Sequence, residues 1–391
     1  MPFLVKLLTL LPLLPLLALA QNESDSSRTR SEVAPSVGKC TSSILPVSIV
    51  ANNTVLNLDP PKDQQALTDF ILRWTSDPAS VNAVVVGDGK TALNNNTYQI
   101  WTTLCLPSKP DAKNTVEFLL HAGGSDHTHW TLGGEGSKYN YAETALKAGH
   151  AVFFYDRLGV GKSQKPHGIK EVQTPTNMEV GAQLVKYLQG KQQFKRVIAV
   201  GHSYGSATLT GLVNVYGNFV DATILTGLTS HVQSFLPGLS TWSHSISAEN
   251  DPKRFGSLGA EYTVWNNVIN NQQNFFSYPN YDPAILQTTE SNKWGLTLGE
   301  MLTSGALPTG KYSNPMLVVT GDQDYLTCGG NCMQAVGNYS NFVDATKELF
   351  SGIPGDKFST YIPLNTGHNI NAHLSTPETF ARIQKWITDL A

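Results

Sequence analysis

Short runs of apolar and β-branched residues alternate with segments of helical spacing over most of the chain. The runs predict strands at 98–106, 116–120, 151–155, 197–201, 222–225, 316–320 and 360–363. Apolar residues at helical spacing predict helices at 64–74 and 141–148, from about residue 174, after residue 203, and from residue 375 onward. Strands that alternate with helices in this way predict an α/β fold with a mostly parallel central sheet flanked by helices.

The alternation stops between residues 231 and 313. This stretch has no clear strand pattern but is rich in aromatic side chains among many Asn and Ser residues. We expect an inserted, mainly helical cap that lines an apolar pocket, although any one of its aromatic residues is as readily explained by the core of the cap itself. The expected organisation is then a tail and ordered extension at 21–97, a core at 98–230 and 314–391, and the cap at 231–313.

One predicted strand ends in the sequence Gly201-His202-Ser203-Tyr204-Gly205 and is followed by a helical pattern. A Gly-x-Ser-x-Gly sequence between a buried strand and a helix is typical of a nucleophile elbow. The serine then lies on a strained turn, and the glycines avoid collisions with the neighbouring strand and helix. We therefore predict that Ser203 is a catalytic nucleophile rather than an ordinary turn serine.

A serine nucleophile needs a histidine as its base, and an acid that orients this histidine. Residues of both kinds follow predicted strands further along the chain. For the base we predict His368, which follows Gly367 after the last strand, with His373 as the alternative. For the acid, Asp322 and Asp324 both stay open on this reasoning, since one of them can cap the turn while the other contacts the histidine.

The oxyanion of an acyl-transfer transition state needs two hydrogen-bond donors. One predicted donor is the backbone N–H of Tyr204, the residue after the nucleophile. The other is the N–H of Gly123, in the loop after the strand at 116–120, where small residues let the backbone approach a ligand.

The same loop contains the sequence Asp126-His127-Thr128-His129, which is similar to a metal-binding motif. The sequence offers no third or fourth ligand at a suitable spacing. We therefore expect its histidines to face solvent or the rim of the pocket, and we predict neither a metal nor an organic cofactor.

Residues 1–20 have the layout of a cleaved secretory signal peptide, with Lys6 before an apolar stretch that ends in a small-x-small sequence. Prolines within this stretch argue against a retained membrane anchor. Glycosylation sequons, which predict surface loops behind such a signal, occur at Asn22, Asn52, Asn95 and Asn338. We expect a secreted protein that does not bind membranes after the signal is removed.

The four cysteines permit three pairings. We favour Cys328–Cys332, because the two glycines between them allow a tight loop, and this leaves Cys40–Cys105. In an oxidising compartment disulfides are favoured over a metal site.

Five short motifs follow one another along the chain: HAGG at 121–124, DRLGVGKS at 156–163, GHSYG at 201–205, GDQD at 321–324 and TGH at 366–368. Together they resemble the α/β-hydrolase superfamily over roughly residues 98–391, with 231–313 as its variable cap. The resemblance implies an α/β-hydrolase fold.

Carried over motif by motif, the functional elements of that family fall on His121, Gly123, Asp324 and His368. The resemblance thus favours Asp324 over Asp322 as the acid. Ala122 stands where the family usually has glycine. The signal, the sequons and the long N-terminal extension look most similar to secreted hydrolases of filamentous fungi.

These features predict a secreted serine hydrolase that cleaves a small carboxylic ester through an acyl-enzyme. A serine nucleophile disfavours the epoxide hydrolases and haloalkane dehalogenases of the same fold. Three alternatives stay open: a peptidase or aminopeptidase that uses acidic cap residues such as Glu249, Asp251 and Glu261, a lactonase or transacylase of a secondary-metabolite pathway, and an inactive binding protein. The small net charge of −3 predicts no nucleic-acid partner.

Overall fold

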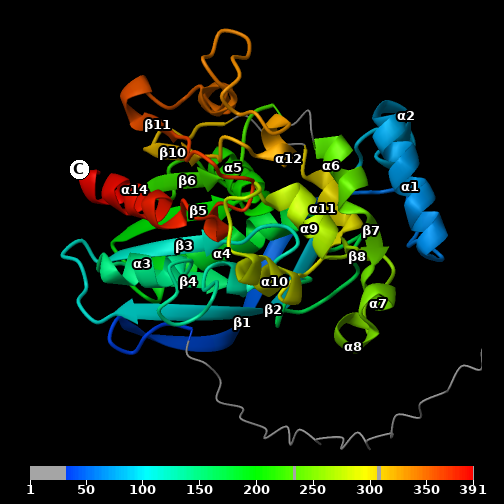
Figure 1. The fold of residues 1–391 in the computed structure, drawn as a ribbon. Coiled ribbons are helices and arrows are strands. Elements are labelled where there is room, and N and C mark those ends of the chain that lie inside the picture. The colour runs from blue at the N-terminus through cyan, green and yellow to red at the C-terminus, as the bar shows by residue number, and fades with distance from the viewer. Residues whose placement is uncertain (1–31, 232–234, 306–309, 391) are drawn as a thin grey trace, which may run out of the picture. The chain divides into compact units, whose positions relative to one another are not determined.

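The main sheet of the computed structural model has eight strands in the order β1-β2-β4-β3-β5-β6-β10-β11 (Figure 1). The pairs from β4 to β11 in this order are parallel, whereas β1–β2 and β2–β4 are antiparallel. The strands are β1 (Gly38–Thr54), β2 (Thr91–Pro107), β3 (Thr115–Leu120), β4 (Ala151–Tyr155), β5 (Arg196–His202), β6 (Ala222–Thr226), β10 (Met316–Val319) and β11 (Phe358–Tyr361). The structure describes residues 32–231, 235–305 and 310–390. The predicted mostly parallel sheet is confirmed.

Helices cover both faces of this sheet, and each face has its own apolar core. The helices are α3 (Tyr141–Lys147), α4 (Thr174–Gly190), α5 (Tyr204–Tyr216) and α14 (Thr376–Asp389). Neighbouring residues of a strand point to opposite faces, so in β3 Phe118 joins the core with residues of α4 and α5, whereas Leu119 joins the core with residues of α3 and α14. Because both faces of the central strands are buried, strands such as β4 and β10 are continuously apolar, which made them visible in the sequence.

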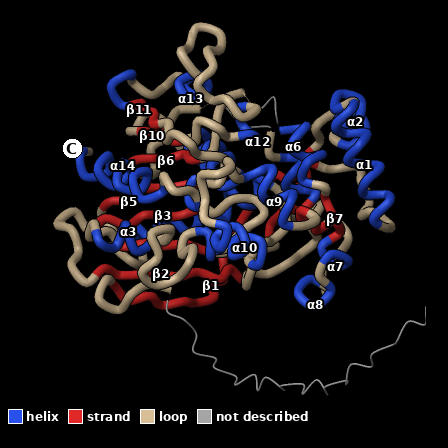
Figure 2. Tube along the Cα trace, in the orientation of Figure 1, coloured by secondary structure: helices blue, strands red, loops and turns tan. Residues whose placement is uncertain are grey.

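In its described residues, the region expected to be a cap forms six helices and a small second sheet. Several of these helices are labelled in Figure 2. The elements are α6 (Phe235–Trp242), β7 (His244–Ile246), α7 (Ser247–Asn250), α8 (Pro252–Phe255), β8 (Tyr262–Trp265), α9 (Val268–Phe275), α10 (Pro283–Ser291), β9 (Leu296–Thr297) and α11 (Leu298–Thr303). The antiparallel sheet β7-β8-β9 corrects our expectation of no strand here. Strands this short carry too few residues for a period of two to be visible.

The segment before the core contributes both to the main sheet and to the cap. β1 pairs with β2 along its whole length, and β2 begins at Thr91, whereas we expected the core to begin at residue 98. Between them lie α1 (Gln64–Ser76) and α2 (Pro78–Val85). The Gln64 side chain bonds to the His244 carbonyl at 2.9 Å and the Ile246 N–H at 2.8 Å, so α1 is fastened to the cap strand β7.

Both expected disulfides are present. Cys40–Cys105 joins directly paired residues of β1 and β2, and Cys328–Cys332 closes the loop after the short helix α12 (Tyr325–Cys328). A further short helix, α13 (Phe342–Ala345), precedes β11.

The prediction of secretion depends on the signal peptide and the glycosylation sequons, and only some of these residues lie in the described part of the chain. The predicted signal at 1–20 and the sequon at Asn22 lie outside the described residues. The asparagines of the other three sequons, Asn52, Asn95 and Asn338, are exposed. Among the described residues, no helix has both the length and the apolar character needed to cross a bilayer.

Candidate active site

Ser203 lies on a strained turn between β5 and α5. Its φ of 54° and ψ of −117° are unfavourable for a residue with a side chain. The Ser203 N–H donates to the Thr226 carbonyl at the end of β6 at 2.8 Å, which helps to hold the turn. A Cβ on Gly205 would lie 2.2 Å from the Leu120 carbonyl oxygen, and one on Gly201 would lie 2.7 Å from the Gly205 carbonyl oxygen. The predicted reason for these two glycines is confirmed.

Three side chains from three different strand ends form one hydrogen-bonded chain at this turn. His368 Nε2 lies 2.7 Å from Ser203 Oγ, and His368 Nδ1 lies 2.7 Å from Asp324 Oδ2. Asp324 is fully buried and His368 is 2% exposed, so the bond between these two side chains is shielded from water, whereas Ser203 is half-buried. The arrangement gives the serine a base, and gives that base a carboxylate partner.

The two candidate acids are separated by their contacts. Asp324 uses its two oxygens differently: Oδ1 accepts from the Thr327 N–H at 3.0 Å and caps α12, while Oδ2 faces His368. Asp322 Oδ1 instead accepts from the Thr366 N–H at 2.9 Å. We expected one aspartate to cap the turn and the other to contact the histidine, but Asp324 does both.

The two predicted oxyanion donors, the N–H groups of Tyr204 and Gly123, come from the start of α5 and from the loop after β3. Tyr204 is the first residue of α5, so its N–H has no partner within the helix. Within the described part of the chain, no backbone acceptor takes the Gly123 N–H. Gly123 lies close to the cap, because a Cβ there would be 2.7 Å from a Leu296 methyl group. Both amides are therefore available to a ligand.

A pocket opens beside His368 and the loop at 122–125. His202, which precedes the serine in sequence, and His368 line this pocket, together with Leu132, Trp265, Phe275 and Asn271. Of the aromatic cap residues, Trp265 and Phe275 line it. Other large aromatics, such as Trp242, pack inside the cap, with ring centres 5.2 Å apart for Trp242 and Phe275.

Two histidines, His129 and His202, lie next to His368, and the sequence offered no reason to expect His202 there. His202 stacks on His129 with ring centres 4.7 Å apart, and its ring lies 5.2 Å from that of His368. Burial lowers the pKa of His129 to about 3 and the pKa of His202 well below its usual value. Both rings are thus neutral and form an uncharged support beneath His368. The sequence predicted His129 only as a residue at the surface or at the pocket rim, and it did not predict that these two rings stack.

The two histidines of the possible metal-binding motif at 126–129 lie in different surroundings. His129 lines the pocket, as expected for a rim residue. His127 is 6% exposed, which corrects the expectation that it faces solvent or the rim. Its Nδ1 lies 2.8 Å from Asp156 Oδ1, and Asp126 lies nearby, so the three residues have the donor types of a metal site. Asp156 raises the pKa of His127 against the effect of burial, and a protonated Nδ1 satisfies the carboxylate without a metal.

His373, the alternative base, fastens the loop that carries His368 to the cap. Its Nε2 accepts from the N–H groups of Gly367 and Ser277, both at 3.0 Å, and its Nδ1–H donates to the Asn369 carbonyl at 2.8 Å. Burial lowers the pKa of His373 to about 4. A neutral ring is required, because protonated Nε2 would face two donors.

We therefore predict that His373 makes the fold sensitive to acid. An unfolded histidine titrates near pH 6.5, whereas this one stays neutral down to about pH 4 when folded. As the pH falls through this window the unfolded state alone binds the proton, so this residue removes about 1.4 kcal/mol of stability per pH unit. In urea unfolding between pH 7 and pH 4.5, the variant His373→Gln should lose stability less steeply than the parent. Equal slopes would contradict the prediction.

Comparisons with known proteins agree with this fold. The description "Alpha/beta hydrolase family" applies to a family profile that matches residues 118–383. A thermophilic esterase from Thermogutta terrifontis is similar in structure, at 13% identity and a TM-score of 0.50, with 75% of this chain and 94% of that chain covered. A monoacylglycerol lipase from Paleococcus ferrophilus is similar at 13% identity and a TM-score of 0.50, with 74% and 98% covered.

No curated protein matches the sequence significantly. The structural likenesses, at such low identity, show the fold alone. The family match shows more than the fold, because it covers more than half of the chain and includes Ser203, Asp324 and His368. The chain belongs to the alpha/beta hydrolase family.

Proposed function

We propose that this protein is a secreted serine hydrolase that cleaves carboxylic esters. The observation that carries the proposal is the continuous hydrogen-bonded chain from Ser203 through His368 to Asp324, with both distances at 2.7 Å. Such a chain converts a weakly nucleophilic hydroxyl into a nucleophile at neutral pH.

The proposed reaction has two halves. Ser203 Oγ bonds to the carbonyl carbon while its proton moves to His368 Nε2, and the Gly123 and Tyr204 N–H groups stabilise the oxyanion. His368 then gives the proton to the leaving alcohol, and an acyl-enzyme remains. Water attacks this ester while His368 takes a proton from it. The bond from Ser203 Oγ to the acyl carbon then breaks, His368 returns the proton to Ser203 Oγ, and the acid is released. Asp324 stabilises the histidine cation in both halves.

The chemistry of the pocket supports a neutral substrate. The described residues that line it include no Asp, Glu, Lys or Arg. His129 and His202 also line the pocket, and both are neutral because burial lowers the pKa of each. A substrate with an ionised group in this pocket would lose its hydration without gaining a counter-charge. An uncharged acyl or alcohol group is therefore favoured.

The acidic residues that an aminopeptidase would need lie elsewhere. Glu261 accepts from the Gly168 N–H at 3.1 Å, and Asp251 accepts from the Arg254 N–H at 3.2 Å and caps α8. Glu249 lines a separate groove with residues of α1. Ester cleavage is therefore favoured over removal of an N-terminal amino acid.

Secretion remains part of the proposal. The support for it is the sequence of residues 1–20, the two disulfides, and the exposure of Asn52, Asn95 and Asn338. Expression in a eukaryotic host should release a glycosylated protein into the medium, and glycosidase treatment should lower its mass. A protein retained unglycosylated in the cytosol would contradict this part.

A substrate panel tests the reaction class. p-Nitrophenyl esters of acetate, butyrate and octanoate are compared with aminoacyl p-nitroanilides and with simple lactones at pH 7.5. We expect the esters to be hydrolysed fastest, and a fluorophosphonate to abolish the activity. Faster cleavage of the anilides would favour a peptidase. A folded protein that neither turns over these compounds nor reacts with the fluorophosphonate would overturn the proposal in favour of a binding protein.

A further inference from the structure

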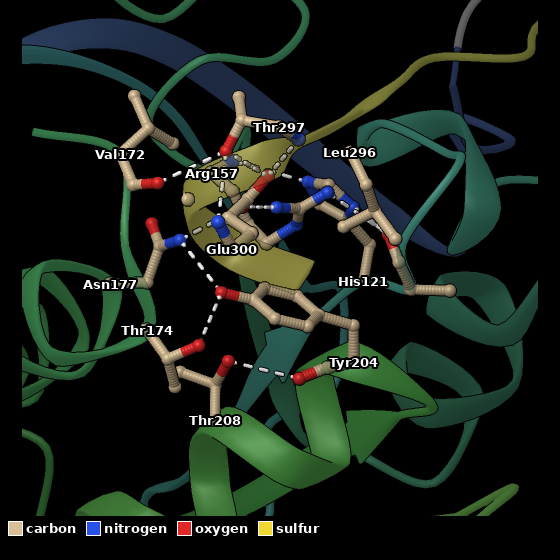
Figure 3. Close-up of polar contacts among 12 residues, drawn as sticks. His121, Arg157, Val172, Thr174, Asn177, Tyr204, Thr208, Leu296, Thr297 and Glu300 are labelled. Atoms are coloured by element: carbon tan, nitrogen blue, oxygen red, sulfur yellow. Dashed lines mark hydrogen bonds and ion pairs between the residues drawn. The ribbon is translucent and has the colours of Figure 1, made fainter. Parts of the chain in front are cut away.

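A buried ion pair lies beside the candidate active site and takes no part in the proposed proton transfers (Figure 3). Arg157 follows β4 and is 1% exposed, whereas Glu300 lies in α11 of the cap and is fully buried. Arg157 Nη1 contacts Glu300 Oε1, and the same carboxylate accepts from Asn177 Nδ2 and from the Thr297 N–H, both at 2.9 Å. Because removing two charges from water is costly, stability alone is a weak explanation for such a pair.

Arg157 connects this pair to the elbow. Its Cζ lies 4.8 Å from the centre of the Tyr204 ring, as expected for a cation over an aromatic face. The far end of that ring is also held, since the Tyr204 hydroxyl bonds to Thr174 Oγ1 at 3.0 Å and accepts from Asn177 Nδ2 at 3.2 Å. Asn177 therefore links Glu300 directly to the side chain of one proposed oxyanion residue (Figure 3).

Arg157 also contacts the loop of the other proposed oxyanion donor. Its Nη2 donates to the Ala122 carbonyl at 3.4 Å, and this oxygen also accepts from His121 Nδ1 at 2.9 Å and Ser125 Oγ at 3.2 Å. The Arg157 backbone N–H donates to His121 Nε2 at 3.1 Å, so the proton of the neutral imidazole is on Nδ1.

The Ala122 carbonyl and the Gly123 N–H belong to the same peptide group. In a planar trans peptide these two bonds point in opposite directions. Donors that hold the oxygen on one side therefore set the direction of the N–H on the other. Three donors, His121 Nδ1, Ser125 Oγ and Arg157 Nη2, therefore restrict the orientation of this peptide group.

We propose that Arg157 and Glu300 are positioning residues that orient the Gly123 N–H, so that a residue of the cap supports the oxyanion hole of the core. The inference rests on the proposed function, because it concerns the donors for a developing oxyanion. Loss of the pair should weaken stabilisation of the tetrahedral state more than it weakens binding of the substrate.

The variant Glu300→Gln tests the proposal, because it keeps the shape and an acceptor oxygen but removes the charge that holds Arg157. We expect kcat per active site, counted by fluorophosphonate titration, to fall about 10- to 100-fold while KM changes little. The inhibition constant of an alkyl trifluoromethyl ketone should rise by a similar factor. This compound forms a bond from Ser203 Oγ to its carbonyl carbon and places the oxyanion in the hole, with the serine proton on His368.

Glu117→Gln is a matched control. Glu117 is also fully buried and has a histidine partner, with His150 Nδ1 at 2.8 Å, but it faces α3 and α14. This control should lower the melting temperature without changing kcat per titrated site or the inhibition constant. If Glu300→Gln behaves in the same way, its role is only structural and the proposal is wrong.

The double variant Arg157→Met/Glu300→Met covers the case in which the single variant does not fold, because it leaves no unpaired buried charge. It should fold and still show the lowered kcat and the weakened ketone binding. Parental values in the double variant would overturn the proposal, and so would failure of both variants to fold, because the pair would then serve the fold itself. If the parent protein does not hydrolyse esters at all, the proposed function fails, which is a separate outcome.

Discussion

Replacing Ser203 by Ala is expected to lower kcat/KM for p-nitrophenyl butyrate by roughly 10⁵-fold or more. The substitution removes only Oγ, the atom that lies 2.7 Å from His368 Nε2. Both residues carry a Cβ, so the strained φ of 54° is unchanged and the fold should be kept. The rate is measured by p-nitrophenol release, and folding is checked by thermal unfolding.

Ser206→Ala is the matched control for this experiment. Ser206 Oγ donates to the Thr226 carbonyl at 2.8 Å and accepts from the Thr226 N–H at 3.0 Å, so this serine is structural. Its loss should cost about 1–3 kcal/mol of stability, because buried backbone groups lose a partner. The catalytic rate per folded molecule should stay near that of the parent. An active Ser203→Ala protein would contradict the assignment of the nucleophile.

Replacing Asp324 by Asn is expected to lower kcat by about 10⁴-fold. The amide oxygen can still accept from the Thr327 N–H and cap α12, so the amide nitrogen then faces His368. An NH₂ group there favours the imidazole tautomer with its proton on Nε2. That tautomer cannot take the proton of Ser203.

The neighbouring Asp322→Asn distinguishes the two candidate acids. Asp322 Oδ1 accepts from the Thr366 N–H, and an amide oxygen can replace it. This variant should therefore keep kcat within about threefold of the parent, since surface and turn substitutions of this kind have small effects. Stopped assays at pH 7.5 on both variants compare them directly. A larger loss for Asp322→Asn than for Asp324→Asn would reverse the assignment.

The main sheet was predictable because its central strands are short, continuously apolar and separated by helices of ordinary length. The antiparallel pair β1 and β2 was harder to predict. The polar run at Asn94, Asn95 and Asn96 has no alternation, yet it lies within β2 because β1 pairs with it residue by residue. The strands of the cap, two to four residues long, are likewise defined by their partners rather than by their own sequence.

The residues of the triad were predictable because each follows a strand, and parallel strands bring such positions to one edge. The supporting residues were not. Glu300 lies 143 residues after Arg157, and its own surroundings, Thr297 to Glu300, resemble an ordinary capping box, which the structure indeed contains. Local sequence thus explains why Glu300 lies in the first turn of a helix, but only the packing of the cap shows that it contacts Arg157.

The most direct test of the account is to identify the residue that a fluorophosphonate modifies. Intact mass should show one adduct per molecule, and peptide mapping should place it on Ser203. The Ser206→Ala protein should be labelled in the same way, and the Ser203→Ala protein should not be labelled. An adduct on a different residue, or labelling of folded Ser203→Ala, would contradict the claim that Ser203 is the nucleophile.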